Sequence, residues 1–253
     1  MQPSLVTKDL TVRFGGHVAV DAVSCAFAPG QLTAIVGPNG AGKTTYFNLI
    51  SGQIRATSGR VELHGRDITR LSAAARTHSG LGRAFQLTNL FPRLTVLENV
   101  RLVVQARARR GFNLWTMAQD HRDLTEQAEA VLDRVRLSHL AGQTVAALSH
   151  GDQRKLEVAA MIALQPSVYM FDEPTAGMSV EEAPVILDLI ASIKADVGAT
   201  VLLVEHKMNV IRSLADRIIV LHNGALVADG DPAEVMASRV VQEAYLGKEL
   251  ADV

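Results

Sequence analysis

The chain of 253 residues contains a single cysteine, Cys25. One cysteine excludes an intrachain disulfide and is typical of a reducing compartment. Because Cys25 lies in the mostly apolar stretch Val23 to Phe27, we expect it to be a buried core thiol. Apolar residues make up 48% of the chain, which is enough for a hydrophobic core and excludes a disordered chain.

An excess of charge of either sign is also lacking. The chain has 25 Lys and Arg residues and 26 Asp and Glu residues, so its net charge is −1. Proteins that bind nucleic acid through bulk charge usually have a strong basic excess, so we expect no nucleic acid partner.

Long apolar runs are missing as well. No run approaches the roughly 18 residues of a membrane-spanning helix. Residues 1–10 lack the apolar segment of a signal peptide and carry both Lys8 and Asp9. We therefore expect a soluble or peripheral protein whose membrane role, if any, depends on a partner.

The patterns that are present alternate between strand and helix. Strands are predicted at Leu5–Thr7, Leu10–Phe14, Val18–Phe27, Leu32–Val36, Gly59–Leu63, Ser167–Phe171, Thr200–Val204 and Arg217–Leu221. From about Thr88 to Gln165 the pattern is helical, another helix is predicted over Val180–Ala195, and Asp231 is predicted to cap a last helix. This order predicts one α/β core interrupted by a helical block.

The segment from Gly37 to Thr44 matches the pattern G-x-x-x-x-G-K-[ST], between a predicted buried strand and a predicted helix. Small residues let successive backbone N–H groups turn toward one anion, and the helix N-terminus favours negative charge. Lys43 can reach the β- and γ-phosphates of a nucleotide, and Thr44 can ligate Mg²⁺. The alternative is a glycine-rich turn with a surface lysine. The predicted nucleotide-binding loop comprises Gly37, Pro38, Asn39, Gly40, Ala41, Gly42, Lys43, Thr44 and Thr45.

A second candidate site follows the apolar stretch Val168 to Phe171, which ends in Asp172 and Glu173. The carboxyl end of a parallel strand faces the ligand crevice of an α/β sheet. Asp172 is therefore predicted to hold Mg²⁺, and Glu173 to orient or deprotonate the attacking water. The alternative is a strand that ends in a polar turn.

Further short motifs occur in order along the chain. They are Phe14, Arg83-Ala84-Phe85-Gln86, Leu148-Ser149-His150-Gly151-Asp152-Gln153, Ala176-Gly177-Met178-Ser179 and Val204-Glu205-His206. Together with the phosphate loop and the Asp172 and Glu173 pair, they resemble the ATP-binding subunits of ABC transporters over nearly the whole chain. In that family they correspond to the adenine-stacking aromatic, the Q-loop, the signature loop, the D-loop and the switch-histidine segment.

The resemblance implies roles for three of these residues. Phe14 is expected to stack on adenine, although it could instead be a core aromatic. Gln86 is expected to touch Mg²⁺ or water and to report to a neighbouring element. His206 is expected to donate a hydrogen bond to a γ-phosphate oxygen. ATP and Mg²⁺ are the implied cofactors, and ATP hydrolysis is the implied activity.

The resemblance also implies an architecture. It is an ABC ATPase fold: an α/β P-loop NTPase core with a parallel sheet, an antiparallel β subdomain and an inserted helical subdomain. Residues 1–86 and 166–253 would form the core, and residues 87–165 the helical subdomain of a single domain over 1–253. In the family, the signature loop binds the γ-phosphate held by the opposite subunit, here through Ser149 and Gly151. A dimer of ATPase subunits, identical or paralogous, is therefore expected.

Three residues depart from the family pattern. His150 replaces the usual first glycine of the signature loop, and Asp152 stands where glutamine is usual. Histidine tolerates a positive φ less readily than glycine, so the geometry of phosphate binding could be altered. Ser179 replaces the D-loop aspartate. Hydrolysis is still expected, because Lys43 and the catalytic carboxylates are retained. A catalytically weak regulatory subunit is the alternative that these departures suggest.

Within the family, the chain most resembles the ATPases of branched-chain amino acid importers. The similar segments are Phe14-Gly15-Gly16, Gly37 to Phe47, Ala84-Phe85-Gln86, Gly151 to Lys155, Gln105 to Gln127 and Glu243 to Gly247. The ATPases of urea importers and lipopolysaccharide exporters are close alternatives. A soluble ABC ATPase of translation or DNA repair usually has two cassettes or a long coiled-coil insertion, and neither pattern is present.

The implied partners are integral membrane permeases and, indirectly, a solute-binding protein, with the chain peripheral to the cytoplasmic face of the cell membrane. Candidates for the permease contact are Leu87, Leu90, Phe91 and Leu97, which could equally be core residues of the helical block. The basic residues Arg101, Arg107, Arg109 and Arg110 could face lipid headgroups, although such a run is more often a solvated face. Trp115 is either an interfacial anchor or a core residue.

Overall fold

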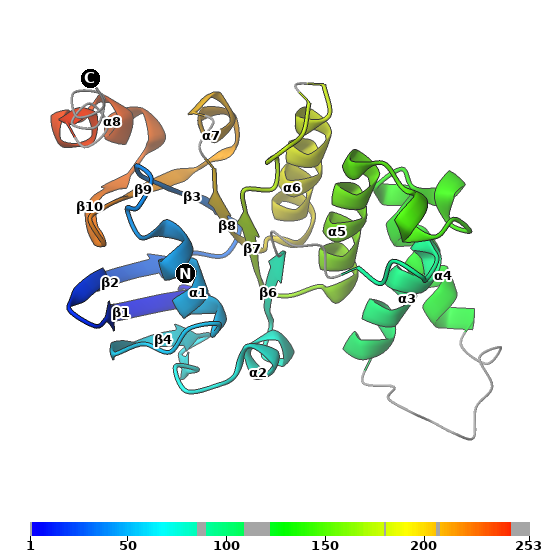
Figure 1. The fold of residues 1–253 in the computed structure, drawn as a ribbon, viewed down its shortest axis with the longest axis horizontal. Coiled ribbons are helices and arrows are strands. Elements are labelled where there is room, and N and C mark those ends of the chain that lie inside the picture. The colour runs from blue at the N-terminus through cyan, green and yellow to red at the C-terminus, as the bar shows by residue number, and fades with distance from the viewer. Residues whose placement is uncertain (1, 85–89, 109–121, 180, 206–207, 244–253) are drawn as a thin grey trace. The chain divides into compact units, whose positions relative to one another are not determined.

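The computed structural model describes residues 2–84, 90–108, 122–179, 181–205 and 208–243 (Figure 1). The chain forms two compact units. Unit 1 comprises residues 1–83, 167–173 and 191–253, and unit 2 comprises residues 84–166 and 174–190. The predicted subdomain boundaries at residues 86/87 and 165/166 stay a prediction.

Unit 1 contains a six-stranded sheet in the order β10-β9-β3-β8-β7-β6. The bounds of these strands are Leu32–Val36 (β3), Leu81–Ala84 (β6), Val168–Asp172 (β7), Thr200–Val204 (β8), Arg217–His222 (β9) and Ala225–Gly230 (β10). The strand β3 pairs in parallel with both β8 and β9, and β7 pairs in parallel with β8. Every residue of β3, β7 and β8 is buried, which explains their continuous apolar sequences.

Unit 1 also contains a four-stranded antiparallel sheet in the order β2-β1-β4-β5. Its strands are Leu5–Phe14 (β1), His17–Phe27 (β2), Ser58–Leu63 (β4) and Arg66–Asp67 (β5). The prediction of two separate strands at the N-terminus was wrong, because β1 is continuous. The polar pair Lys8-Asp9 marks an irregularity within it, where Asp9 has a φ of +48° and the register shifts.

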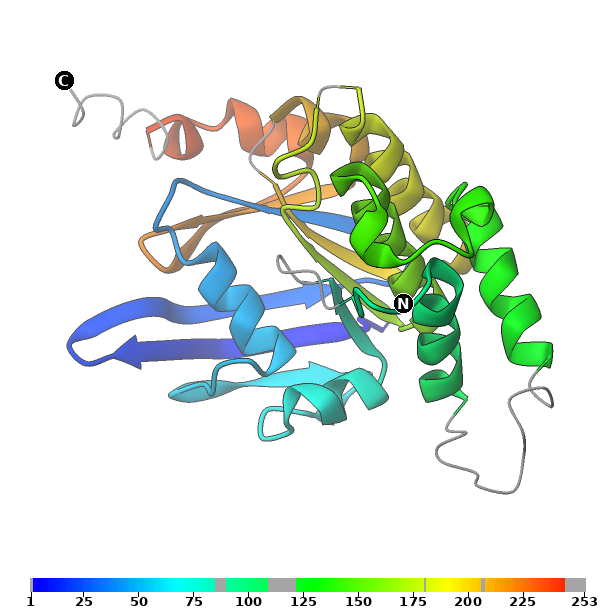
Figure 2. The ribbon, with the colours of Figure 1, turned by 45° about the vertical axis from the view of Figure 1, so that its right-hand side comes forward.

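A helix, α1 (Lys43–Ser51), packs against strands of both sheets within one hydrophobic cluster (Figure 2). Its buried face includes Tyr46, whose hydroxyl lies 2.8 Å from Thr7 Oγ1. Cys25 belongs to the same cluster, so the predicted core thiol is confirmed. Burial raises the pKa of this thiol to about 11, so Cys25 is protonated at neutral pH.

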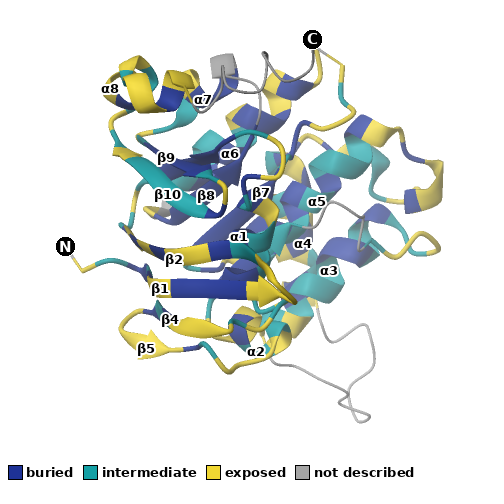
Figure 3. Ribbon diagram, turned by 60° about the vertical axis from the view of Figure 1, so that its left-hand side comes forward, coloured by how far each residue is buried: buried dark blue, intermediate teal, exposed yellow. Residues whose placement is uncertain are grey.

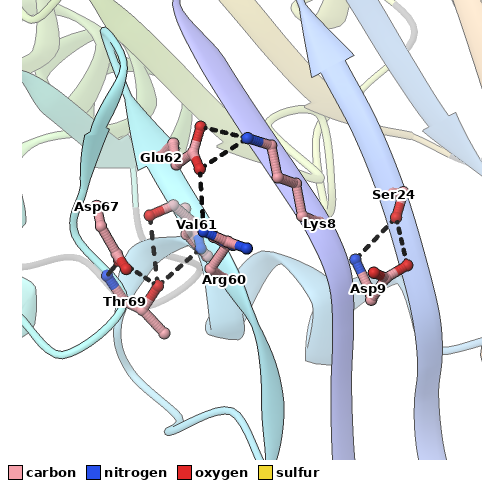
Figure 4. Close-up of polar contacts among 8 residues, drawn as sticks. All are labelled: Lys8, Asp9, Ser24, Arg60, Val61, Glu62, Asp67 and Thr69. Atoms are coloured by element: carbon pink, nitrogen blue, oxygen red, sulfur yellow. Dashed lines mark hydrogen bonds and ion pairs between the residues drawn. The ribbon is translucent and has the colours of Figure 1, made fainter.

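The outer residues of the antiparallel sheet are polar and exposed, most clearly in β4 and β5 (Figure 3). Lys8 on β1 forms an ion pair with Glu62 on β4, with 2.8 Å between Nζ and Oε1, and Ser24 hydrogen-bonds Asp9 (Figure 4). Exposed ion pairs of this kind contribute at most about 1 kcal/mol each. The stability of this sheet therefore comes mainly from its buried face.

Unit 2 is helical, as the pattern between Thr88 and Gln165 predicted. It contains α3 (Val96–Arg107), α4 (Arg122–Arg134) and α5 (His150–Leu164), and α6 (Ala183–Val197) begins in it and continues into unit 1. The start of α3 is fixed by a capping box, in which Thr95 accepts from the Glu98 backbone and the Glu98 carboxylate accepts from the Thr95 backbone. The hydrogen bonds from Thr95 lower the pKa of Glu98, so this cap is charged at neutral pH.

The remaining helices are short. They are α2 (Ala73–His78), α7 (Met208–Leu214) and α8 (Pro232–Ala237). Asp231 accepts hydrogen bonds from the backbone N–H groups of Ala233 and Glu234, which confirms it as the cap of α8. No helix in the described part of the chain is long and apolar enough to cross a membrane.

Candidate functional site

A pocket of about 410 Å³ opens at the carboxyl end of β3, in unit 1. It is lined by Phe14, His17, Ala19, Asn39, Gly40, Ala41, Gly42, Lys43, Thr44, Thr45 and Glu173. The structure thus brings together most of the predicted phosphate loop, the predicted catalytic carboxylate and the predicted stacking aromatic. Phe14 is 51% exposed, so it is not a core aromatic and its ring is available to a ligand. His17 and Ala19 also line the pocket, and no sequence pattern marks either of them as a site residue.

Two glycines of the loop are required by close backbone approaches. Gly37 has a φ of +149°, and a Cβ there would lie 2.1 Å from the carbonyl oxygen of Leu221. Gly42 has a φ of +97°, and a Cβ there would lie 2.5 Å from the carbonyl oxygen of Ala19. Both positions therefore require glycine, because neighbouring backbone fills the space that a side chain would need.

The loop leads directly into the N-terminus of α1. Within the described residues, no side chain caps this end and no acidic residue lies in the first turn of α1. Such an end presents backbone N–H groups and a partial positive charge, which together can bind an anion. The Lys43 side chain is buried beside it, and Nζ donates hydrogen bonds to the carbonyl oxygens of Gly37 at 2.7 Å and Pro38 at 3.0 Å. These bonds hold the ammonium group at the loop.

Asp172, at the end of β7, is held by Arg83, a residue of the predicted Q-loop motif for which no role was predicted. Arg83 Nη2 donates to Asp172 Oδ2 at 2.9 Å, and the two side chains are only 8% and 0% exposed. Arg83 Nη1 also donates to Asn48 Oδ1 and Ser51 Oγ on α1. Burial lowers the pKa of Arg83, and the Asp172 carboxylate opposes this shift, so the pair remains ionic.

Replacing Arg83 with leucine is expected to lower the free energy of unfolding by about 3 kcal/mol, because it leaves the Asp172 carboxylate buried without its cation. Urea denaturation measures this change. The matched control is Arg55→Leu, since Arg55 is exposed, and its effect is expected to stay within about 0.5 kcal/mol. Equal effects of the two substitutions would contradict a structural role for the Arg83–Asp172 pair.

Glu173 lies at the pocket in an uncommon backbone conformation. Its φ is +50°, and its N–H donates to the carbonyl oxygen of Val204 at 2.9 Å. A positive φ in a residue other than glycine costs of order 1 kcal/mol or more and recurs at functional sites. The hydrogen bond to β8 holds this conformation, which brings the carboxylate to the pocket wall.

Two predicted oxygen donors are suited to magnesium, Thr44 at the pocket and Asp172 at the end of β7. Mg²⁺ is usually bound by one or two protein oxygens together with substrate phosphates. The hydroxyl of Thr44 and the carboxylate of Asp172 are donors of this type. Among the described residues, no group of three or more His, Cys, Asp and Glu side chains could hold a metal ion. The chemistry of these two donors fits a magnesium ion shared with a nucleotide; Thr44 lines the pocket, whereas Asp172 is buried and is not among its lining residues.

Ser149 and Gly151 lie in unit 2, at the start of α5. Ser149 is the N-cap, and its hydroxyl accepts from the backbone of Asp152 at 3.1 Å and donates to Asp152 Oδ2 at 2.7 Å. Lys155 Nζ lies 2.9 Å from Asp152 Oδ1. Partial burial raises the pKa of Asp152, but hydrogen bonds from Lys155 and Ser149 outweigh this and hold it below its ordinary value. Asp152, which differs from the family's signature pattern, thus places a charged, hydrogen-bonded carboxylate in the first turn of α5.

Glu182 is a further residue of the candidate site that was not predicted from the sequence. Its Oε2 accepts hydrogen bonds from the Ser179 hydroxyl at 3.1 Å and the Ser179 backbone at 3.3 Å. The Glu182 backbone donates in return to Ser179 Oγ at 3.2 Å. The spacing Ser-x-x-Glu is the sequence signal of such a reciprocal cap and could have identified it. Both residues lie in unit 2 with the signature loop.

Several predicted residues lie outside the described part of the chain: Gln86, Leu87, Arg109, Arg110, Trp115 and His206.

Of the predicted permease contacts that are described, Phe91 is 55% exposed, whereas Leu90 and Leu97 are half-buried. Arg107 donates to the carbonyl oxygen of Ala163 and to Gln127 Oε1, so it belongs to the helical packing of unit 2.

Comparisons with known proteins agree with this geometry. Residues 20–176 match the family model "ABC transporter", and residues 225–251 match "Branched-chain amino acid ATP-binding cassette transporter". The high-affinity branched-chain amino acid transport ATP-binding protein BraF of Pseudomonas aeruginosa is 36% identical over 253 residues, covering 98% of this chain and 99% of BraF.

Two solved structures are also similar. The ADP conformation of MJ1267, an ATP-binding cassette of an ABC transporter, matches with a TM-score of 0.83 at 30% identity, covering 98% of this chain and 100% of that one. The dimeric post-hydrolysis state of the cassette MJ0796, bound to ADP and Pi, matches with a TM-score of 0.76 at 26% identity, covering 90% and 98%. The predicted fold class is confirmed, and the chain belongs to the ATP-binding cassette family of ABC transporters, as one of its nucleotide-binding ATPases.

Proposed function

We propose that this chain is the ATP-hydrolysing subunit of an importer that moves branched-chain amino acids through separate membrane subunits. The observation that carries the proposal is the full-length similarity to BraF, supported by the match at residues 225–251 to the branched-chain amino acid cassette family. The subunit works at the cytoplasmic face of the cell membrane, bound to permeases that receive solute from a binding protein.

The nucleotide is held by unit 1. Backbone N–H groups of the loop and of the α1 N-terminus bind the phosphates, and Phe14 stacks on the adenine. The Lys43 ammonium turns from the carbonyl oxygens of Gly37 and Pro38 to the β- and γ-phosphates. Both carbonyls lie within the loop, so the side chain exchanges partners without a large displacement.

Hydrolysis uses the carboxylates at the end of β7. Thr44, Asp172 and Gln86 would hold a magnesium ion, which when bound would supply positive charge beside the phosphates. Glu173 orients the attacking water and accepts its proton, a role that its place on the pocket wall supports. His206 donates a hydrogen bond to a γ-phosphate oxygen.

A second cassette completes the site. One chain carries one phosphate loop and one signature loop, so two chains are needed to bring Ser149 and Gly151 to a bound γ-phosphate. The dimeric state of MJ0796 supports this arrangement. The second cassette is either an identical chain or a paralogous one. Among the predicted contacts to the permease, Phe91 is the strongest candidate because its aromatic ring is exposed.

The test is reconstitution of the chain with its permeases and solute-binding protein in lipid vesicles. Leucine, isoleucine or valine is expected to stimulate ATP hydrolysis and to accumulate inside the vesicles with the binding protein, whereas urea is expected to do neither. Stimulation by urea alone would contradict the proposed substrate class. Hydrolysis by the chain that never responds to permeases would contradict its role in transport.

A further inference from the structure

A carboxylate lies against the signature loop inside unit 2. A Cβ built on Gly151 would lie 2.4 Å from Glu182 Oε1 and 3.0 Å from Glu182 Cδ. The Glu182 side chain therefore fills the space beside the second residue of α5. The ring of the neighbouring His150 lies close to the D-loop segment, since its Cε1 is 3.7 Å from a Cβ built on Gly177.

The N-terminus of α5, beside Gly151, favours the binding of an anion. The first turn of α5 presents backbone N–H groups and the positive end of the helix dipole. Ser149 satisfies one of those donors, the N–H of Asp152, and Lys155 neutralises the Asp152 carboxylate through their ion pair. The Glu182 carboxylate thus lies at the residue, Gly151, that the proposed function assigns to an incoming phosphate.

Two anions at one helix N-terminus repel each other; Glu182 is exposed to water in the single chain, so the repulsion becomes strong only when a second cassette covers the signature loop and excludes water. A γ-phosphate that reaches Gly151 from a second cassette must therefore displace Glu182 or bind more weakly beside it. We propose that Glu182 is an internal substitute for the γ-phosphate: its carboxylate occupies the Gly151 side of the signature loop in the ATP-free chain and must leave when ATP closes the dimer.

Displacement of Glu182 has a structural consequence within the same unit. The Glu182 carboxylate accepts two hydrogen bonds from Ser179, in the turn that leads into α6. When the carboxylate moves away from Gly151, these bonds must break or move with it. Glu182 therefore couples arrival of the phosphate at α5 to the conformation of the D-loop segment, at the position where Ser179 replaces the usual aspartate. It is a positioning residue and takes no part in bond breaking.

The test is Glu182→Gln, which removes the charge but keeps the shape and the capping pattern, since glutamine replaces glutamate in capping boxes. ATP-driven association of the chain with its partner cassette is followed by light scattering over a range of ATP concentrations, in a Glu173→Gln background that slows turnover. The variant is expected to associate at an ATP concentration about tenfold lower than the parent, because one repulsive charge has been removed.

The matched control is Glu181→Gln, which removes a neighbouring exposed charge and is expected to leave the ATP dependence unchanged. Urea denaturation of Glu182→Gln should match the parent, which separates the effect from a change in folding. If Glu182→Gln and Glu181→Gln both associate at the ATP concentration of the parent, Glu182 is only a helix cap and the inference is overturned. The inference rests on the proposed function, which fails separately if the parent never associates with ATP.

Discussion

Replacing Glu173 with glutamine is expected to slow ATP hydrolysis by about 10²- to 10⁴-fold, the range over which a positioned general base contributes. Glutamine has the same shape as glutamate but cannot accept the proton of the attacking water at neutral pH. Glu173 has a φ of +50°, and glutamine would carry the same backbone strain. The substitution therefore isolates the proton-accepting group, and phosphate release under saturating ATP measures its effect.

Binding must be measured alongside turnover. Calorimetry of Glu173→Gln with Mg-ATP is expected to give an affinity close to that of the wild type, because Lys43 and the loop are unchanged. Glu234→Gln, in the exposed first turn of α8, is the control for loss of a carboxylate and should hydrolyse ATP at the wild-type rate. Equal turnover by Glu173→Gln and the wild type would mean that another group activates the water.

A methyl group at Gly37 is expected to have the largest effect on the loop itself. In Gly37→Ala the new Cβ would lie 2.1 Å from the carbonyl oxygen of Leu221, which belongs to the backbone of β9 and cannot rotate away. The strand or the loop must shift, so we expect a loss of about 3 kcal/mol or more in the free energy of unfolding. Nucleotide binding should be lost with the shape of the loop. Urea denaturation and calorimetry measure the two effects.

Gly40→Ala is the matched control within the same loop. Gly40 also has a positive φ, +80°, but a Cβ there would meet no atom within 4 Å. Only the cost of the left-handed backbone remains, about 1 to 2 kcal/mol. If Gly37→Ala and Gly40→Ala proved equally stable, the close approach of Leu221 would not determine the identity of residue 37.

The sequence predicts the strands and the loop that form the nucleotide site, because local patterns of apolar residues and glycines determine them. Leu32–Val36 and Thr200–Val204 have the predicted bounds, since a continuous apolar run marks a strand buried on both faces. Glycine spacing and Lys43 predict the loop that follows β3. By contrast, β10 (Ala225–Gly230) was missed, because all but one of its residues are only partly buried and its pattern is weak.

The residues that position the site depend on contacts between distant parts of the chain. Arg83 and Asp172 are 89 residues apart, and only the fold reveals that they form a buried ion pair. Glu182 lies close in sequence to Ser179, but its approach to Gly151 depends on the packing of unit 2. The bulge at Asp9 is likewise set by strand pairing with β2 and β4 rather than by local propensity.

The most direct test of the central claim is calorimetry of Mg-ATP with the wild-type chain and with Lys43→Ala. The claim is that the loop around Lys43 binds the terminal phosphates of a nucleotide. We predict binding of about one nucleotide per chain, with an affinity about 10- to 100-fold weaker in Lys43→Ala, because charge-assisted hydrogen bonds to the phosphates are lost. Equal affinity of the two proteins, or no binding of Mg-ATP by the folded wild type, would contradict it.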